Sequence, residues 1–73
     1  MPHIADRLKC LRKAKGLTQK DVALAVDKTE RTYRRYEASE IEPSATTIVK
    51  LADFFDVSTD YLLGRTDNPR IYM

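Results

Sequence analysis

The sequence predicts a compact all-α domain made of five short helices. Its 73 residues suffice for one small domain with a single core. Apolar residues recur at helical spacing in separate stretches, and helix-capping or turn-forming residues divide these stretches. No stretch shows the alternation of apolar and polar residues that is typical of a half-buried strand. A helical arrangement with short loops therefore suits a chain of this length best.

The first helix is predicted over residues 4–15. Ile4, Leu8 and Leu11 stand at i, i+4 and i+7, so they form one apolar stripe on a helix surface. Gly16 follows directly, and glycine is the usual residue where a helix ends in the left-handed conformation.

The second helix is predicted within the segment TQKDVALAVDKTERTYRRYE, residues 18–37. Thr18 is a suitable N-cap, because its hydroxyl can accept a hydrogen bond from the first turn. The apolar residues of the following turns fall on one inward stripe: Val22, Ala23 and Val26. The three residues after the cap are expected to face water: Gln19, Lys20 and Asp21.

The third helix is predicted over about residues 30–38. Asp27 and Lys28 form a polar break before it, and Thr29 is a second N-cap. On this helix two tyrosines share one face and charged residues cover the rest: Tyr33 and Tyr36, against Glu30, Arg31, Arg34 and Arg35. The two short helices must approach each other closely, and Ala23, which has no side chain beyond Cβ, is expected to lie where Tyr33 crosses it.

The last two helices are predicted after serine caps. Ser44 precedes residues 45–55, and Ser58 precedes a short helix that closes at Gly64. Their core positions are Ile48, Leu51, Ala52 and Phe55 in the fourth helix, and Tyr61 and Leu62 in the fifth. We place the domain at residues 1–66 and a C-terminal tail at residues 67–73, because the sequence Asp67-Asn68-Pro69 breaks regular structure.

Charge is distributed unevenly along the chain. Residues 1–36 contain ten Lys or Arg and four Asp or Glu, which gives +6. Residues 37–73 contain three and seven, which gives −4 and agrees with the total of +2. A basic half of this kind orients a protein toward a polyanion, although a solvated basic face without a partner would give the same pattern.

The inventory of reactive residues argues against an enzyme. His3 is the one histidine, so a histidine-based catalytic triad or multi-histidine metal site cannot be built. Gly16 and Gly64 are the only glycines and are better explained as helix caps than as a phosphate-binding loop. Cys10 is the one cysteine, expected to be a small helix filler, with redox sensing as the alternative. We predict no enzymatic activity, no metal, no cofactor and no small-molecule ligand.

No targeting or membrane segment is recognised in the sequence. No apolar run approaches the roughly 20 residues that span a bilayer, and Met1-Pro2-His3 does not begin a signal sequence. We therefore expect no membrane partner and a cytoplasmic location.

The segment of residues 18–37 resembles the helix-turn-helix of the phage-repressor and Cro-like (Xre-type) family of bacterial and phage regulators. Further segments are similar to that family in the same order: RLKCLRKAKG to its first helix, Leu17-Thr18-Gln19 to the start of its second, Arg35-Tyr36-Glu37 to the end of its recognition helix, Pro43-Ser44 to the start of its fourth, and VSTDYLLGRTDNP to its fifth helix and exit. The resemblance implies a lambda-repressor-like domain that binds double-stranded DNA in a sequence-specific manner and regulates transcription.

The resemblance also implies site residues. Positions that read base edges in the family are matched by Glu30, Arg31, Arg34 and Arg35, and positions that contact phosphate by Gln19, Lys20, Lys28 and Thr29. Arginine suits guanine O6 and N7, and glutamate suits cytosine N4. Glu30 is equally well explained as a favourable charge at a helix N-terminus, and capping alone would explain Thr29.

Structural roles and departures from the family follow from the same positions. Arg12 and Glu37 match a pair in the family, although two solvated charges are the alternative. Asp27 stands where glycine is usual in the turn, and Tyr33 replaces the usual Ile or Val. The loop Ser39-Glu40-Ile41-Glu42 lacks the glycine and basic residues common there, which predicts a weaker phosphate clamp.

Two functions remain open from the sequence. The first is a repressor of phage, mobile-element or toxin-antitoxin type that binds a palindromic operator as a homodimer. Its candidate dimer residues are Tyr61, Ile71, Tyr72 and Met73, unless the tail is free and Tyr61 lies in the core. The second is a protein-interaction module that keeps the fold and holds another protein through Ile41 and residues 71–73.

Overall fold

The computed structural model describes residues 4–70, and this part of the chain folds into helices and loops without a strand. The helices are α1 (Ile4–Ala14), α2 (Gln19–Ala25), α3 (Glu30–Glu37), α4 (Ala45–Phe55) and α5 (Thr59–Leu62). The all-α fold class is confirmed, and the predicted bounds hold to within one residue for α1, α3 and α4.

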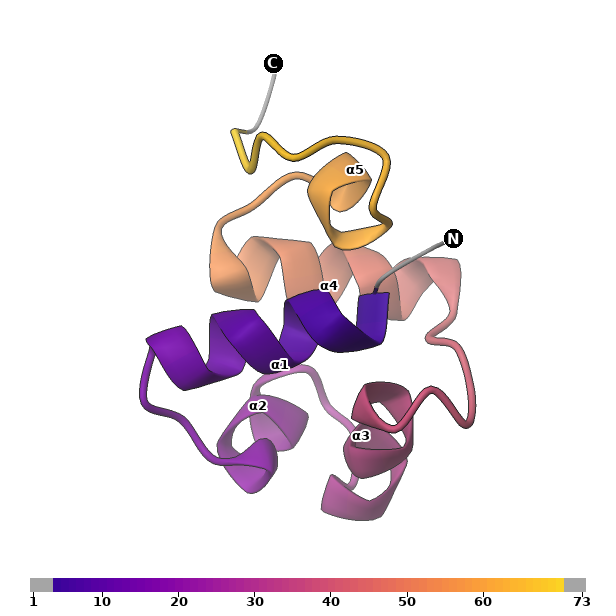
Figure 1. The fold of residues 1–73 in the computed structure, drawn as a ribbon. Helices are drawn as coiled ribbons and strands as arrows, with labels where there is room; N and C mark the ends of the chain where they lie inside the picture. The colour runs from indigo at the N-terminus through magenta and orange to yellow at the C-terminus, as the bar shows by residue number, and fades with distance from the viewer. Residues whose placement is uncertain (1–3, 71–73) are drawn as a thin grey trace.

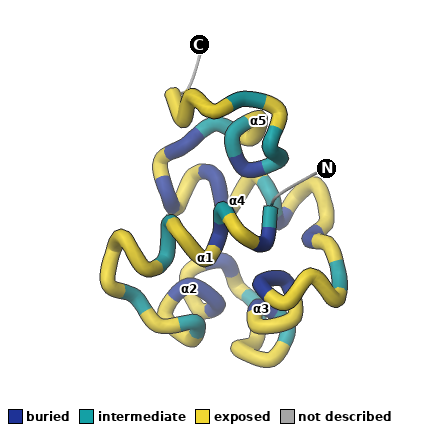
Figure 2. The backbone as a smooth tube through the Cα atoms, viewed as in Figure 1, coloured by how far each residue is buried: buried dark blue, intermediate teal, exposed yellow. Residues whose placement is uncertain are grey.

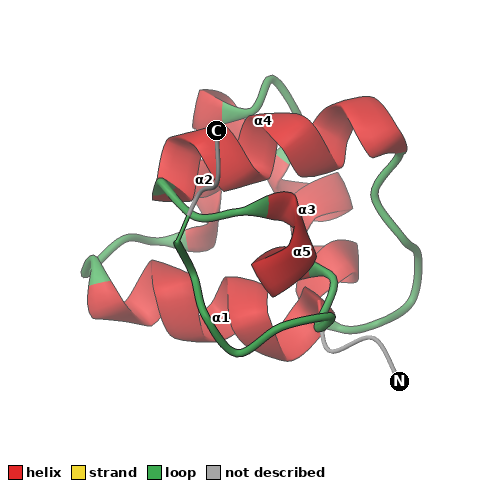
Figure 3. Ribbon diagram, turned by 90° about the horizontal axis from the view of Figure 1, so that it is seen from above, coloured by secondary structure: helices red, strands yellow, loops and turns green. Residues whose placement is uncertain are grey.

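The helices stack in three levels, with α1 and α4 in the middle (Figure 1). The α2–α3 pair lies on one side of this middle level, and α5 lies on the other side with the C-terminal segment (Figures 1 and 3). Contacts join α2 to α3, α4 to α5, and α1 to both α3 and α5. The α2–α3 pair therefore occupies one end of the molecule, and α5 with the C-terminal segment occupies the opposite end.

The last four helices begin at hydroxyl caps. Thr18, Thr29, Ser44 and Ser58 each accept a hydrogen bond from the backbone N–H three residues later. At α2 the cap is reciprocal, because the Asp21 carboxylate also accepts from the Thr18 N–H at 3.0 Å. The sequence predicted these caps, but it did not identify the second half of the α2 capping box.

Each described helix is followed by a residue in the left-handed conformation: Gly16, Asp27, Ser39, Asp56 and Gly64, with φ between 58° and 78°. In every case the next N–H bonds back to the carbonyl five residues earlier, which satisfies an otherwise unpaired helix end. Asp27, which stands where glycine is usual in the family, thus takes the left-handed conformation that glycine adopts most readily. Ser39 and Asp56 were not identified from the sequence, since a side chain there costs roughly 1 kcal/mol and glycine is preferred.

The core is formed by all five helices (Figure 2). Its fully buried side chains are Leu8, Val22, Val26, Tyr33, Leu51 and Leu62. Ala23 is also buried, so α3 can pack closely across α2. Ile48 of the predicted stripe is only half-buried and packs against the edge of this core.

A buried ion pair connects α3 to α1. The Nε and Nη2 atoms of Arg12 donate to the two carboxylate oxygens of Glu37 at 2.7 and 3.0 Å, and the Glu37 side chain is only 2% exposed. The third nitrogen, Nη1, donates to the Leu17 carbonyl at 3.0 Å. One guanidinium therefore joins α1, the loop after it and the end of α3.

Gln19 takes part in the same network. The expectation that it faces water is wrong, because Gln19 is half-buried and its Nε2 donates to Glu37 Oε1 at 3.2 Å. Burial opposes ionisation of Glu37, but the hydrogen bonds that stabilise its charge outweigh burial and lower its pKa. Glu37 is therefore a charged residue held by α1 and α2 together.

Tyr33 places a hydroxyl beside this network. Its oxygen is the one fully buried side-chain polar atom in residues 4–70 that lacks a hydrogen-bond partner of acceptable geometry. Burial, reinforced by the neighbouring Glu37 carboxylate, raises the pKa of Tyr33. The aromatic ring packs edge-on against Tyr36, with 6.2 Å between ring centroids.

The segment after α5 returns to the domain. Arg7 of α1 donates to the Thr66 carbonyl at 3.2 Å and to the Asp67 carboxylate at 2.9 Å. Further along, the Pro69 carbonyl accepts from the Ser58 N–H at 3.0 Å. The boundary proposed at residue 66 stays a prediction, although residues 67–69 contact the domain.

We expect Arg12→Ala to lower the free energy of unfolding by about 3 kcal/mol, because it leaves the buried Glu37 carboxylate without its partner. Glu37→Ala should cost less, since Arg12 is the more exposed of the two side chains. Urea unfolding measures both, with Arg34→Ala as the control for an exposed ion pair, expected to cost under about 1 kcal/mol. Losses within experimental error for both Arg12→Ala and Glu37→Ala would contradict a structural role.

We expect Tyr33→Phe to raise the free energy of unfolding by about 1 kcal/mol, because it removes a buried hydroxyl without a partner and keeps the ring. Thermal and urea unfolding of the two proteins measure the change. A loss of about 1 kcal/mol instead would mean that the hydroxyl is satisfied, with Glu37 as the acceptor.

Candidate nucleic-acid interface

Helix α3 has one buried face and one exposed face. Tyr33, Tyr36 and Glu37 are buried, and the last of these is held by Arg12 and Gln19. The three arginines of α3 are exposed: Arg31, Arg34 and Arg35. A helix of eight residues thus fixes its backbone through one side and presents concentrated positive charge on the other.

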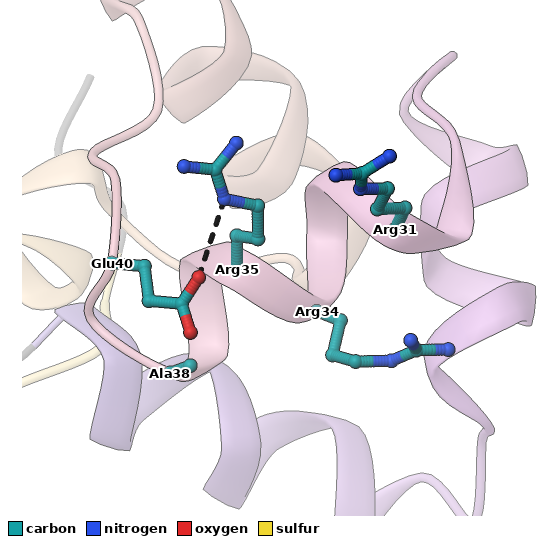
Figure 4. Close-up of a pocket in the computed structure, with 5 residues that line it drawn as sticks. All are labelled: Arg31, Arg34, Arg35, Ala38 and Glu40. Carbon is teal, nitrogen blue, oxygen red and sulfur yellow. Dashed lines mark hydrogen bonds and ion pairs between the residues drawn. The ribbon is translucent and has the colours of Figure 1, made fainter.

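The arginines line a hollow at the surface of α3 (Figure 4). Its volume is about 470 Å³, and its walls are Arg31, Arg34, Arg35, Ala38 and Glu40. Arg31 and Arg35 extend to the same side of the helix, as expected of residues four apart, whereas Arg34 points another way (Figure 4). The structure therefore separates the arginines into a pair and a single residue.

Two of these arginines have acidic neighbours. Arg34 Nη2 contacts Glu30 Oε2 at 3.3 Å, one turn away on the same helix. Arg35 Nε contacts Glu40 Oε1 at 3.3 Å, across the end of the helix. Both pairs are exposed and contribute little to stability.

The two acidic partners, Glu30 and Glu40, differ in what could be predicted about them from the sequence. Glu30 lies in the first turn of α3, where a negative charge is favourable, and its role in base reading stays a prediction. Glu40 was recognised only as a departure from the basic loop of the family. Its pairing with Arg35 depends on how the chain turns after α3, which residue spacing alone does not reveal.

The predicted phosphate-binding residues lie in different surroundings. Lys20 is exposed and Lys28 is half-buried. The Thr29 hydroxyl oxygen accepts from the Thr32 N–H at 3.1 Å, which accounts for its capping role. Gln19 already donates to Glu37, so a phosphate contact from its side chain would have to compete with that bond.

The predicted dimer residues are only partly described. Tyr61 is half-buried, and the Arg7 guanidinium carbon lies 3.9 Å from its ring centroid, a cation–π contact. Ile71, Tyr72 and Met73 lie outside the described residues. The exposed large apolar side chains of residues 4–70 are found elsewhere, at Leu24, Val49 and Phe54.

Within residues 4–70, no three His, Cys, Asp or Glu side chains gather closely enough to hold a metal ion. Over the same residues, no helix has both the length and the apolar character needed to cross a membrane. Cys10 is exposed and forms no disulfide there.

Residues 8–62 match the helix-turn-helix family. Curated relatives include the uncharacterized HTH-type transcriptional regulator YobD of Bacillus subtilis (strain 168), 43% identical over 64 residues, which are 88% of this chain and 57% of that protein. The cryptic phage CTXphi transcriptional repressor RstR of Vibrio cholerae is 37% identical over 62 residues, or 85% of this chain and 55% of that protein. The chain thus spans little more than half the length of these relatives.

Solved structures agree with the fold. The P22 c2 repressor in complex with synthetic operator 9T has a TM-score of 0.79 and 27% identity, and the match covers 82% of this chain and 91% of that one. A transcriptional regulator from Listeria innocua has a TM-score of 0.84 and 30% identity, with 88% and 60% of the two chains covered. Since the family match spans most of the five-helix domain, the chain belongs to the helix-turn-helix family of phage-repressor and Cro-like (Xre-type) regulators.

Proposed function

We propose that this chain binds double-stranded DNA in a sequence-specific manner and represses transcription, with α3 in the major groove. The main observation in support is the division of α3: its inner face is fixed by Glu37, while its arginines are exposed around one hollow. The major groove admits an α-helix, and phosphates attract the positive charge. A helix built in this way can enter the groove without losing its attachment to the core.

The residues divide into two proposed roles. Arg31 and Arg35 extend from the same side of α3, so we assign guanine reading to these two residues first. Glu30 and Arg34 are assigned secondary base contacts beside them. Phosphate contacts are assigned to the starts of the two helices, where backbone N–H groups already favour an anion: Gln19, Lys20, Lys28 and Thr29.

Similar proteins support this function. The P22 c2 structure contains a synthetic operator, and RstR is described as a transcriptional repressor. Because the chain spans little more than half of its curated relatives, activities of a longer protein stay outside this proposal. We further propose that the domain has no catalytic role and acts in the cytoplasm.

The alternative of a protein-interaction module has less support. Ile41, one of its two proposed contacts, is half-buried and packs against the core. The other contact, residues 71–73, lies outside the described part. No observation on residues 4–70 favours it over DNA binding. The two functions also differ in their response to salt, because contacts with phosphate release counterions and weaken steeply as salt rises.

We expect Arg31→Ala and Arg35→Ala each to lose roughly 1 to 3 kcal/mol of binding free energy on the best DNA site and to relax preference at particular base pairs. Lys20→Ala should weaken binding to all sequences alike, because a phosphate contact carries no base information. Sites are first selected from random duplexes, and affinities are then measured on the selected and scrambled sites. Equal losses of binding free energy on the selected and scrambled sites for both arginine variants would mean that these arginines contact phosphates and do not read bases.

We expect the working species to be a dimer that tightens on DNA, with recognition helices about 34 Å apart over two half-sites. One small domain makes few base contacts, and two copies restore discrimination among genomic sites. Sedimentation of the full chain and of a chain lacking residues 71–73 measures the assembly, with and without the selected DNA. Unchanged dimerisation on truncation would exclude the tail, and a one-to-one complex on a palindromic site would exclude the dimer.

A further inference from the structure

We propose that Glu40 is a positioning residue for base reading. It holds the guanidinium of Arg35 by the Nε edge and directs the terminal nitrogens toward a guanine in the major groove. The inference rests on the proposed function, and it extends that function to an acidic residue outside the recognition helix. Three observations carry it: the edge of Arg35 that is bound, the anchoring of Glu40, and the contrast with Arg34.

The contact leaves the reading edge of Arg35 open. Glu40 Oε1 accepts from Arg35 Nε at 3.3 Å, and no other hydrogen bond to the Arg35 side chain occurs within residues 4–70. The two terminal nitrogens point away from Glu40 (Figure 4). Arginine reads guanine by pairing two N–H groups with O6 and N7, and the terminal pair can do this while Nε stays bound to a carboxylate.

The backbone holds Glu40 in place. Ser39 takes the left-handed conformation with φ 60°, which turns the chain back at the end of α3. The Glu40 N–H then donates to the carbonyl of Arg35 itself, at 3.0 Å. Glu40 is therefore tied to Arg35 twice, once by its backbone and once by its carboxylate. A residue at the end of a free loop would not be restrained in this way.

Arg34 provides the contrast. Its contact with Glu30 uses the terminal nitrogen Nη2 at 3.3 Å, so the carboxylate occupies the edge that would face a base. Arg31 has no acidic partner within 4.0 Å among the described residues. Among the three arginines of α3, Arg35 alone is oriented by a carboxylate while its terminal edge remains available.

The same carboxylate disfavours random DNA. At a wrong sequence Arg35 can gain a phosphate contact, but the negative charge of Glu40 lies beside it and repels that phosphate. At the right sequence Arg35 retains its contact with Glu40 and also forms hydrogen bonds with a guanine. Glu40 should therefore raise the ratio of specific to random affinity more than it changes the affinity for the specific site. The pair is exposed, so we expect an effect of about two- to fivefold on this ratio.

The test is Glu40→Gln, which removes the charge and keeps the size of the side chain. Glu42→Gln is the matched control: it makes the same change in charge two residues away, at an exposed position without an ion pair among residues 4–70. Affinities are measured on the selected site, on the site with the guanine read by Arg35 replaced, and on a scrambled duplex. Glu40→Gln should lower discrimination at that base pair by about two- to fivefold, whereas Glu42→Gln should shift all three affinities alike.

A double-mutant cycle assigns the effect to the contact. In the Arg35→Ala background, Glu40→Gln should no longer change preference at any base pair, because no guanidinium remains to be oriented. Thermal unfolding of every variant checks that the fold is retained, which the exposure of both side chains favours.

The outcomes separate the inference from the proposed function. If Glu40→Gln and Glu42→Gln shift specific and random binding equally, Glu40 acts by charge alone and the inference is overturned. A full effect of Glu40→Gln in the Arg35→Ala background overturns it as well, because the effect would not pass through Arg35. If instead the unaltered chain shows no preference for any selected site, the proposed function itself fails.

Discussion

The buried carboxylate of Glu37 is the contact on which the arrangement of α1, α2 and α3 depends. Arg12 reaches it from α1 with two nitrogens, and Gln19 reaches it from the first residue of α2. The third nitrogen of Arg12 holds the Leu17 carbonyl in the loop between them. A charge this deeply buried is tolerated only when it is paired and hydrogen-bonded, so these elements cannot separate without exposing an unpaired ion.

The buried face of α3 holds the helix in place, whereas the side chains of its exposed face are only weakly paired. Of the three exposed arginines, Arg34 and Arg35 are paired at 3.3 Å with Glu30 and Glu40, and the exposure of both pairs makes them weak. The Arg34–Glu30 pair occupies the terminal edge of its arginine and costs little to break. The Arg35–Glu40 pair leaves the terminal edge of Arg35 open, so it can persist when that edge contacts a base. The inner face fixes the position of the helix, whereas the proposed base contacts lie on the outer face. A small domain can thus divide stability and recognition between the two sides of one helix.

Short connections impose backbone strain on this molecule. Three of the five left-handed residues that follow its helices carry side chains, at Asp27, Ser39 and Asp56. Each is compensated by a hydrogen bond that closes the helix end, and Ser39 also places Glu40 beside Arg35. At the opposite end, Arg7 covers Tyr61 and binds the segment after α5. Local turns and a few long side chains thus supplement a small core.

Helix positions, hydroxyl caps and the inward stripes of α2 and α4 could be read from residue spacing, because helical periodicity and capping are local properties. The resemblance to the family added the Arg12 and Glu37 positions and the arginines of α3. The half-buried Gln19, the left-handed Ser39 and the contacts of Arg7 and Glu40 were not predicted. Each of these depends on which side chain a turn or a neighbouring helix brings within reach. Periodicity places a residue on a face of its own helix, whereas its partner across the fold is decided by tertiary packing.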